Sequence, residues 1–131
     1  MEVRVGALFR VTMILVFLQI ALGGLITLFS FTPIPHIING FVVLGLAIVI
    51  LIVAQTLKPP FRPLRGLSIG LVLATVLQII LGFVALGENE VVAWVHLLIA
   101  VGIYGMVVAG TFMSMRLDHI SRAPSAASAG P

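Results

Sequence analysis

The chain contains no cysteine, and only 8% of its 131 residues are charged. Without cysteine, the chain cannot form a disulfide framework, a cysteine-ligated zinc site, an iron–sulfur cluster or a thiol nucleophile. Soluble domains average about 45–50% apolar and about 25% charged residues, whereas 61% of this chain is hydrophobic. A domain of this length cannot hide so much apolar surface from water. The composition excludes a soluble enzyme, a nucleic-acid-binding domain and a disordered chain, and it indicates a protein embedded in the lipid bilayer.

Charged residues are missing from long stretches, which divides the chain into membrane-spanning segments. None occurs between Val11 and Leu57, a run too long for one helical span of about 20 residues. Pro33 and Pro35 interrupt this run, and a proline-rich basic connection and a Gly-Glu-Asn-Glu turn follow later. The sequence predicts an all-α membrane protein, a four-transmembrane-helix bundle in one domain over residues 1–122, followed by a disordered tail over 123–131. The four helices are expected near residues 8–29, 33–57, 66–86 and 91–115.

Basic and acidic residues are distributed unequally between the two ends of the expected bundle. The connection between the third and fourth spans carries two acidic residues, Glu88 and Glu90. The basic residues all flank the other end: Arg4, Arg10, Lys58, Arg62, Arg65, Arg116 and Arg122. Because basic residues accumulate in cytoplasmic segments, this distribution predicts that both termini are cytoplasmic.

Two parts of the sequence resemble each other in residue order and spacing. The segment 18–23 reads LQIALG and the segment 77–82 reads LQIILG, so five of six positions are identical at an offset of 59. At an offset of 60, His36 matches His96. Matching Gln, Gly and His in order is harder to obtain by chance than matching Leu and Ile. The pattern predicts two duplicated helical hairpins related by an axis along the membrane normal, which turns one histidine onto the other.

The histidine pair is the main candidate for a functional site. A histidine inside a span is costly and usually faces the bundle interior. A single one is commonly a hydrogen-bonding residue between helices, but a symmetric pair suits the two axial positions of a haem iron. Copper or zinc would need a third ligand, and the spans offer none at that depth. We expect His36 and His96 to bind one haem per chain, b-type or related; the alternative is a structural pair.

Small residues follow both histidines on the same helix faces. Gly40 and Ala100 each lie four residues after a histidine, about one helical turn further along. Their small side chains leave room for a flat macrocycle beneath the imidazole, which makes them candidates for haem contact. The alternative is that they allow close packing between helices.

Four polar or aromatic residues are the remaining candidates for haem contact. Gln19 and Gln78 lie near the middle of the first and third spans, and each has a glycine four residues later. A midplane amide must find hydrogen bonds inside the bundle, either at the macrocycle edge or on another helix. Asn39, one turn after His36, allows the same two interpretations. Trp94 either anchors its helix at the outer interface or contacts the haem.

These motifs together resemble heme A synthase, a family that takes part in cytochrome oxidase assembly. The resemblance rests on Gln-x-x-x-Gly in the first and third spans and a histidine near the outer start of the second and fourth. It is clearest over 77–110 and covers 8–115. Because the family has two four-helix halves, the chain resembles a half-size form in the cell membrane of a prokaryote. The resemblance implies that His36 and His96 are axial ligands and that heme O is oxidised to heme A.

The chain departs from that family at positions that matter for chemistry. The family's catalytic half has a carboxylate three residues before the histidine of its second helix. Here that position is Pro33, and Ala93 occupies the corresponding position before His96. Ile37 and Leu97 stand where an arginine often follows the histidine in the family. The catalytic residues therefore remain unassigned.

Three functions follow from these patterns. The first is a heme A synthase-like oxidoreductase acting as a homodimer, because one histidine pair provides only one haem site per chain. The second is a non-catalytic b-type cytochrome, an electron-transfer or accessory subunit of a respiratory complex, which the missing carboxylate favours. The third is a haem-free scaffold or transporter subunit. The histidine symmetry and the lack of a membrane-embedded acid for ion coupling argue against the third.

Overall fold

The computed structural model describes residues 5–58, 60–87 and 89–122, with side chains described as far as Leu117. These ranges contain no strand, and their helices are α1 (Val5–Phe29), α2 (Ile34–Thr56), α3 (Arg62–Ala85) and α4 (Glu90–Arg122). Each helix has a segment with a mean hydropathy between 2.3 and 2.9, and all four are long and apolar enough to cross a membrane. The predicted all-helical membrane architecture is confirmed. The expectations for Arg4, Glu88, the tail over 123–131, and the side chains of His119 and Arg122 fall outside the described part.

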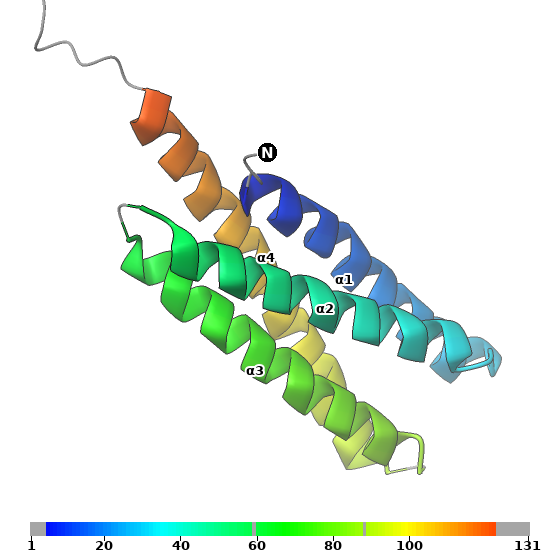
Figure 1. Ribbon diagram of the computed structural model, residues 1–131. Coiled ribbons are helices and arrows are strands. Elements are labelled where there is room, and N and C mark those ends of the chain that lie inside the picture. Colours follow the sequence, from blue (N-terminus) through cyan, green and yellow to red (C-terminus); the bar gives the residue numbers. More distant parts are fainter. Residues whose placement is uncertain (1–4, 59, 88, 123–131) are drawn as a thin grey trace, which may run out of the picture.

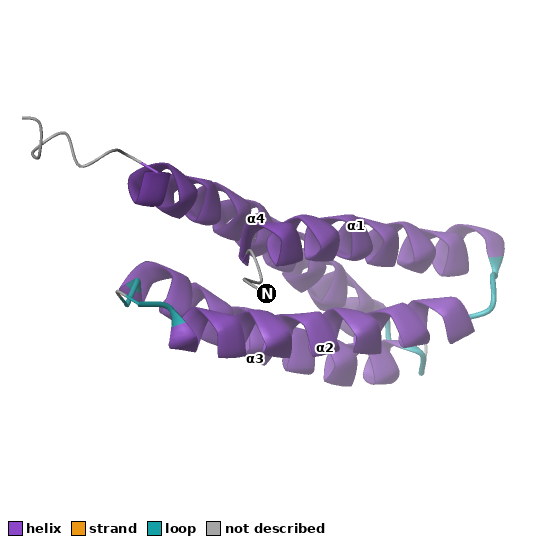
Figure 2. Ribbon diagram, turned by 45° about the horizontal axis from the view of Figure 1, so that its top comes forward, coloured by secondary structure: helices purple, strands orange, loops and turns teal. Residues whose placement is uncertain are grey.

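The four helices run alternately up and down and form a ring. α1 packs on α2 and α4, and α3 also packs on α2 and α4. The views in Figures 1 and 2 agree with this order, in which α1 lies diagonally opposite α3 and α2 lies opposite α4. The connections α1–α2 and α3–α4 lie at one end of the bundle. The start of α1, the α2–α3 connection and the end of α4 lie at the other end.

The local sequence explains where several helices begin and end. α1 ends before Ser30, whose φ of 52° lies in the left-handed region that terminates helices. α3 begins at Arg62, four residues before the expected start, because Pro63 fits the first turn of a helix. α4 continues beyond its expected end to Arg122, since neither glycine nor proline interrupts 116–122.

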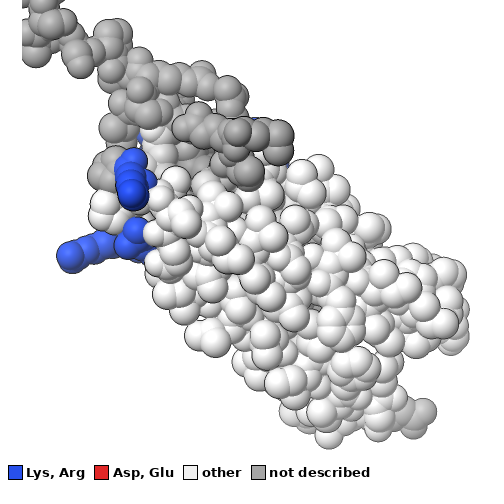
Figure 3. Space-filling model, in the orientation of Figure 1, with Lys and Arg blue, Asp and Glu red and all other residues white. Residues whose placement is uncertain are grey.

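Basic side chains gather at the end of the bundle that holds the α2–α3 connection, as Figure 3 shows for one face of the molecule. Arg65, in the first turn of α3, reaches back to the end of α2. Its Nε donates to the carbonyl of Ala54 at 3.3 Å, and its Nη2 donates to that of Gln55 at 2.7 Å. The last carbonyls of a helix lack partners within the helix and carry partial negative charge, so a guanidinium there stabilises the helix end.

Apolar side chains fill the inside of the ring and also cover its outer faces. Ile50, Leu64, Leu71 and Val107 are fully buried in the core. Large apolar side chains on the outer faces are more than half exposed, among them Ile14, Phe17, Leu73 and Leu98. Such extensive apolar exposure is unusual for a protein in water and suits contact with the lipid bilayer.

α1 and α4 pack closely near the basic end, where the ring of Phe9 lies against the backbone of Gly110. A Cβ atom built at Gly110 would overlap three ring carbons of Phe9, Cε1, Cδ1 and Cζ. Phe9 is fully buried, so its ring has little free space to move into. The contact therefore requires glycine on α4.

We expect Gly110→Ala to destabilise the protein by about 1–3 kcal/mol, because overpacking forces Phe9 out of its rotamer. Gly105→Ala is the matched control on the same helix, since a Cβ there meets nothing within 4 Å. That control is expected to be neutral or to stabilise the helix by up to about 1 kcal/mol. Unfolding in detergent micelles, followed by circular dichroism, measures both. Equal unfolding midpoints for the two variants would contradict the packing, and adding Phe9→Leu to Gly110→Ala should recover part of the loss.

Candidate functional site

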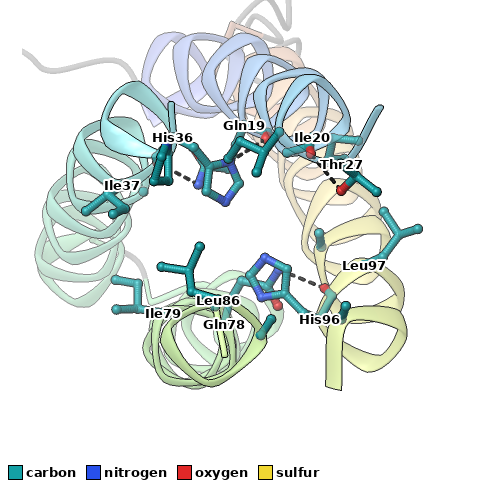
Figure 4. Close-up of a pocket in the computed structure, with 18 of the residues that line it drawn as sticks. Gln19, Ile20, Thr27, His36, Ile37, Gln78, Ile79, Leu86, His96 and Leu97 are labelled. Carbon is teal, nitrogen blue, oxygen red and sulfur yellow. Dashed lines mark hydrogen bonds between the residues drawn. The ribbon is translucent and has the colours of Figure 1, made fainter. Parts of the chain in front are cut away.

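The two histidines project from opposite sides into the space that the four helices surround (Figure 4). His36 lies in the first turn of α2 and His96 in the second turn of α4, the two helices that start at the same end of the bundle. Their imidazole centroids are 6.1 Å apart, and the ring planes are inclined by 57°. The expectation that the two imidazoles face each other across the bundle is confirmed.

In the first hairpin, α1 holds His36 by two hydrogen bonds with Gln19. The side-chain Nε2 of Gln19 donates to the His36 carbonyl at 2.9 Å. The imidazole Nδ1 of His36 lies 3.1 Å from the Gln19 carbonyl oxygen. Because a carbonyl oxygen only accepts, Nδ1 carries the hydrogen and Nε2 keeps a free lone pair. The first histidine is therefore oriented with its second nitrogen available as a metal ligand.

The second hairpin repeats part of this arrangement between α3 and α4. The Nε2 atom of Gln78 donates to the His96 carbonyl at 2.8 Å, as Gln19 does to His36. Oε1 of Gln78 is buried without a hydrogen-bond partner among the residues that the structure describes, and Nδ1 of His96 approaches the Gln78 backbone without regular hydrogen-bond geometry. The two hairpins thus share the bond from glutamine to the histidine backbone and differ in the remaining polar contacts.

A glycine on the neighbouring helix lies against each imidazole. A Cβ atom at Gly23 would lie 3.3 Å from Cε1 of His36, and one at Gly82 would lie 3.1 Å from Cε1 of His96. Both distances are closer than ordinary van der Waals contact, so a side chain at either position would push the imidazole away. Each glycine stands four residues after the glutamine that bonds the same histidine. One Gln-x-x-x-Gly motif therefore holds one histidine in each hairpin.

A cavity of about 730 Å³ surrounds the imidazoles, with walls from all four helices. Its lining is mainly apolar; Figure 4 shows Ile37 and Ile79 on one side and Ile20 and Leu97 on the other. Cavities of about 300–1,000 Å³ with apolar walls and a few polar groups are typical of sites for small molecules and cofactors. The polar groups that converge here are mainly the histidines and glutamines already described.

The structure brings most of the candidate residues to this cavity. The ones that line it are Gln19, His36, Gly40, Gln78, Trp94, His96 and Ala100. Asn39 is instead buried against α1, where its Nδ2 donates to Oε1 of Gln19 at 2.7 Å and to the Leu15 carbonyl at 2.9 Å. Asn39 therefore supports a glutamine of the site and forms no part of the cavity wall.

Two features of the site are not evident from the sequence. The contact of Gly23 and Gly82 with the imidazoles depends on how the helices pack, although the repeated Gln-x-x-x-Gly motif was the available signal. The other feature is Glu90, in the first turn of α4, which lines the cavity. The sequence offers no spacing that distinguishes Glu90 from any other acidic residue in a connection.

Comparison with known protein families, curated proteins and solved structures finds no match for this chain.

Proposed function

We propose that the protein is an integral membrane haem protein in which His36 and His96 are the two axial ligands. The observation that carries this proposal is the distance of 6.1 Å between the imidazole centroids. An imidazole nitrogen binds a metal at about 2.0–2.1 Å and lies about 1 Å from its ring centre, so imidazoles on opposite sides of one metal have centroids about 6 Å apart. The 57° inclination is compatible, because rotation about the metal–nitrogen bond leaves this distance unchanged.

The ligand set also favours haem over a bare metal ion. Within residues 5–58, 60–87 and 89–117, no group of three or more His, Cys, Asp or Glu side chains could hold a metal. Two histidines suit an iron whose other four ligands are the nitrogens of a tetrapyrrole. His36 and His96 would hold that iron, and the apolar wall would contact the macrocycle and exclude water. Bound haem would supply a one-electron redox centre.

Purification after haem-replete expression tests this proposal. We expect the protein to carry one haem per chain with a low-spin absorption spectrum, because two imidazole ligands give a six-coordinate iron. Folded protein that contains no haem would contradict the proposal.

The first role that we propose for this haem site is a heme A synthase-like oxidation of heme O to heme A. Its support is the resemblance of the repeated Gln, Gly and His motifs to that family. With one site per chain, separate cofactor and substrate haems would require a homodimer. Glu90 is the carboxylate that lines the cavity within the described ranges, which makes it the available acid or base.

The second role is a non-catalytic b-type cytochrome, either an electron-transfer or an accessory subunit of a respiratory complex. A specific observation favours it. Pro33 and Ala93 line the cavity, and they occupy the positions three residues before the histidines where the family's catalytic half uses a carboxylate. Neither side chain can transfer a proton. An electron-transfer role requires no such group.

Extraction of the bound haem distinguishes the two roles. The protein is co-expressed with a heme O synthase, and the haems are extracted, separated and identified by mass. Hydroxylated or formylated heme O is expected for the oxidoreductase and should decrease in Glu90→Gln. Unmodified haem alone, together with a low-spin spectrum, would eliminate the oxidoreductase and leave the cytochrome.

We also propose that the two hairpins arose by duplication and that both termini are cytoplasmic, in the cell membrane of a prokaryote. Support for duplication comes from the equivalent bonds of Gln19 with His36 and Gln78 with His96. The clustering of basic side chains at one end of the bundle supports the orientation.

Single cysteines test the orientation cleanly, because the chain has none of its own. We expect Glu90→Cys to react with a membrane-impermeant thiol reagent added outside intact cells. Arg62→Cys should react only after the cells are opened. The reverse labelling pattern would overturn the orientation.

A further inference from the structure

The two histidines are supported unequally, although both hairpins contain the same Gln, Gly and His residues. In the first hairpin, Asn39 donates to Oε1 of Gln19 and to the Leu15 carbonyl, so both polar atoms of the Gln19 amide have partners. The residue that corresponds to Asn39 in the second hairpin, at the offset of 60, is Ile99. Ile99 packs against the apolar core and offers no side-chain hydrogen bond.

The Nδ1 atoms of the two imidazoles also differ in their hydrogen bonding. Nδ1 of His36 is bonded to the Gln19 carbonyl at 3.1 Å. In the second hairpin, Oε1 of Gln78 is buried without a partner among the described residues, and the contact of Nδ1 of His96 with the Gln78 backbone falls short of regular hydrogen-bond geometry. A hydrogen bond to the second nitrogen fixes a ligand ring and makes it a stronger donor, and its loss weakens metal binding by about 10–100-fold. His96 is thus the less firmly held of the two histidines.

We propose that His36 is the permanent axial ligand and His96 the exchangeable one; this inference rests on the haem site proposed above. In such an exchange, Nε2 of His96 would leave the iron with its electron pair. A small neutral ligand would donate its own lone pair in its place, so no electron or proton would be transferred. The second hairpin thereby forms a binding site for small neutral donor molecules.

The cavity around His96 suits this ligand class. Ala93 and Ala100 flank His96 on α4 and have small side chains, so they leave space beside the imidazole. The mainly apolar wall would disfavour an anion, and the carboxylate of Glu90 also lines the cavity. A compact uncharged molecule such as carbon monoxide is not disfavoured by the apolar wall or repelled by the Glu90 carboxylate.

Two glycine variants test the inference, with carbon monoxide as the probe of the ferrous haem protein. We expect His96→Gly to keep its haem on His36 and to bind carbon monoxide at least about tenfold more tightly than the unmodified protein. His36→Gly should lose its haem during purification, and free imidazole should restore it if the variant is folded. Equal haem retention by both variants, or loss from both, would overturn the inference.

An exchange of the supporting residues provides a second test that does not remove either ligand. Ile99→Asn gives Oε1 of Gln78 the donor that Asn39 gives to Gln19, so we expect weaker binding of carbon monoxide by about tenfold. Asn39→Ile frees Gln19 and should raise the high-spin fraction of the haem. A purely structural role would change thermal stability without changing the carbon monoxide titration. An unchanged titration in haem-loaded Ile99→Asn would count against the proposal.

The unmodified protein distinguishes failure of the proposed haem site from failure of the proposed exchange at His96. If it binds no haem, the proposed haem site is wrong and the exchange with it. If it binds low-spin haem while the glycine variants behave alike, the haem site stands and only the exchange is wrong.

Discussion

Alanine in place of either His36 or His96 should abolish the low-spin haem spectrum of the purified protein. The low-spin state requires both axial nitrogens, and each histidine supplies one of them. The cavity lining, as far as the structure describes it, contains no third histidine that could substitute. The loss is therefore expected to be complete in each single variant. Reduced-minus-oxidised absorption spectra, normalised to the amount of folded protein, measure it.

The remaining histidine of the chain provides the control. His119 lies near the end of α4, far along the helix from His96. His119→Ala should keep the complete low-spin spectrum. A low-spin spectrum that survives in either cavity variant, or that disappears in His119→Ala, would refute the assignment of the axial pair.

Valine in place of Gly23 or Gly82 should weaken haem binding by about 10–100-fold, a range typical for the loss of groups that support a metal ligand. Each glycine lies directly against an imidazole, and even a Cβ atom would lie only 3.3 Å or 3.1 Å from its Cε1. The additional methyl groups of valine displace the ring from the position in which its nitrogen points at the iron. Haem titration of the purified variants, followed by the low-spin absorbance, measures the change.

Gly102→Val is the matched control for this prediction. It makes the same change in helix propensity, but a Cβ at Gly102 meets nothing within 4 Å and the residue is exposed on the outer face of α4. Haem binding by this control should match that of the unmodified protein. If all three valine variants lose haem to the same extent, the effect is one of helix stability and the proposed contact with the imidazoles is wrong.

The fold follows from the sequence because membrane spans depend on a few local features. The charge-free run, the prolines at 33 and 35, and the polar connections determine how many helices form and roughly where they turn. Helix ends are less predictable, since they depend on cap geometry. Arg62 illustrates this: it belongs to α3 because Pro63 fits the first helical turn, whereas composition alone placed it in the connection.

Only the part of the candidate site that the sequence repeat defines, the pair of histidines, can be predicted from the sequence. The match between His36 and His96 predicts that the imidazoles face each other, which the centroid distance confirms. Each glutamine donates to the backbone carbonyl of a histidine on the neighbouring helix. The pattern of side chains along the sequence does not predict the position of that carbonyl. Asn39 is expected either at the macrocycle edge or bonded to another helix, and its bonds to Gln19 and Leu15, which depend on the packing of α1 on α2, agree with the second interpretation. Whether haem binds remains a prediction.

The contact between Phe9 and Gly110 has a consequence for the route by which a cofactor enters. It joins α1 to α4 near the basic end, and Gly6 lies against Ser114 of α4 in the same region. The cavity lies further along the helices, toward the α1–α2 and α3–α4 connections. The bundle is thus closed at its basic end by tight packing between α1 and α4. A cofactor bound as proposed would enter from the opposite end or from the surrounding lipid.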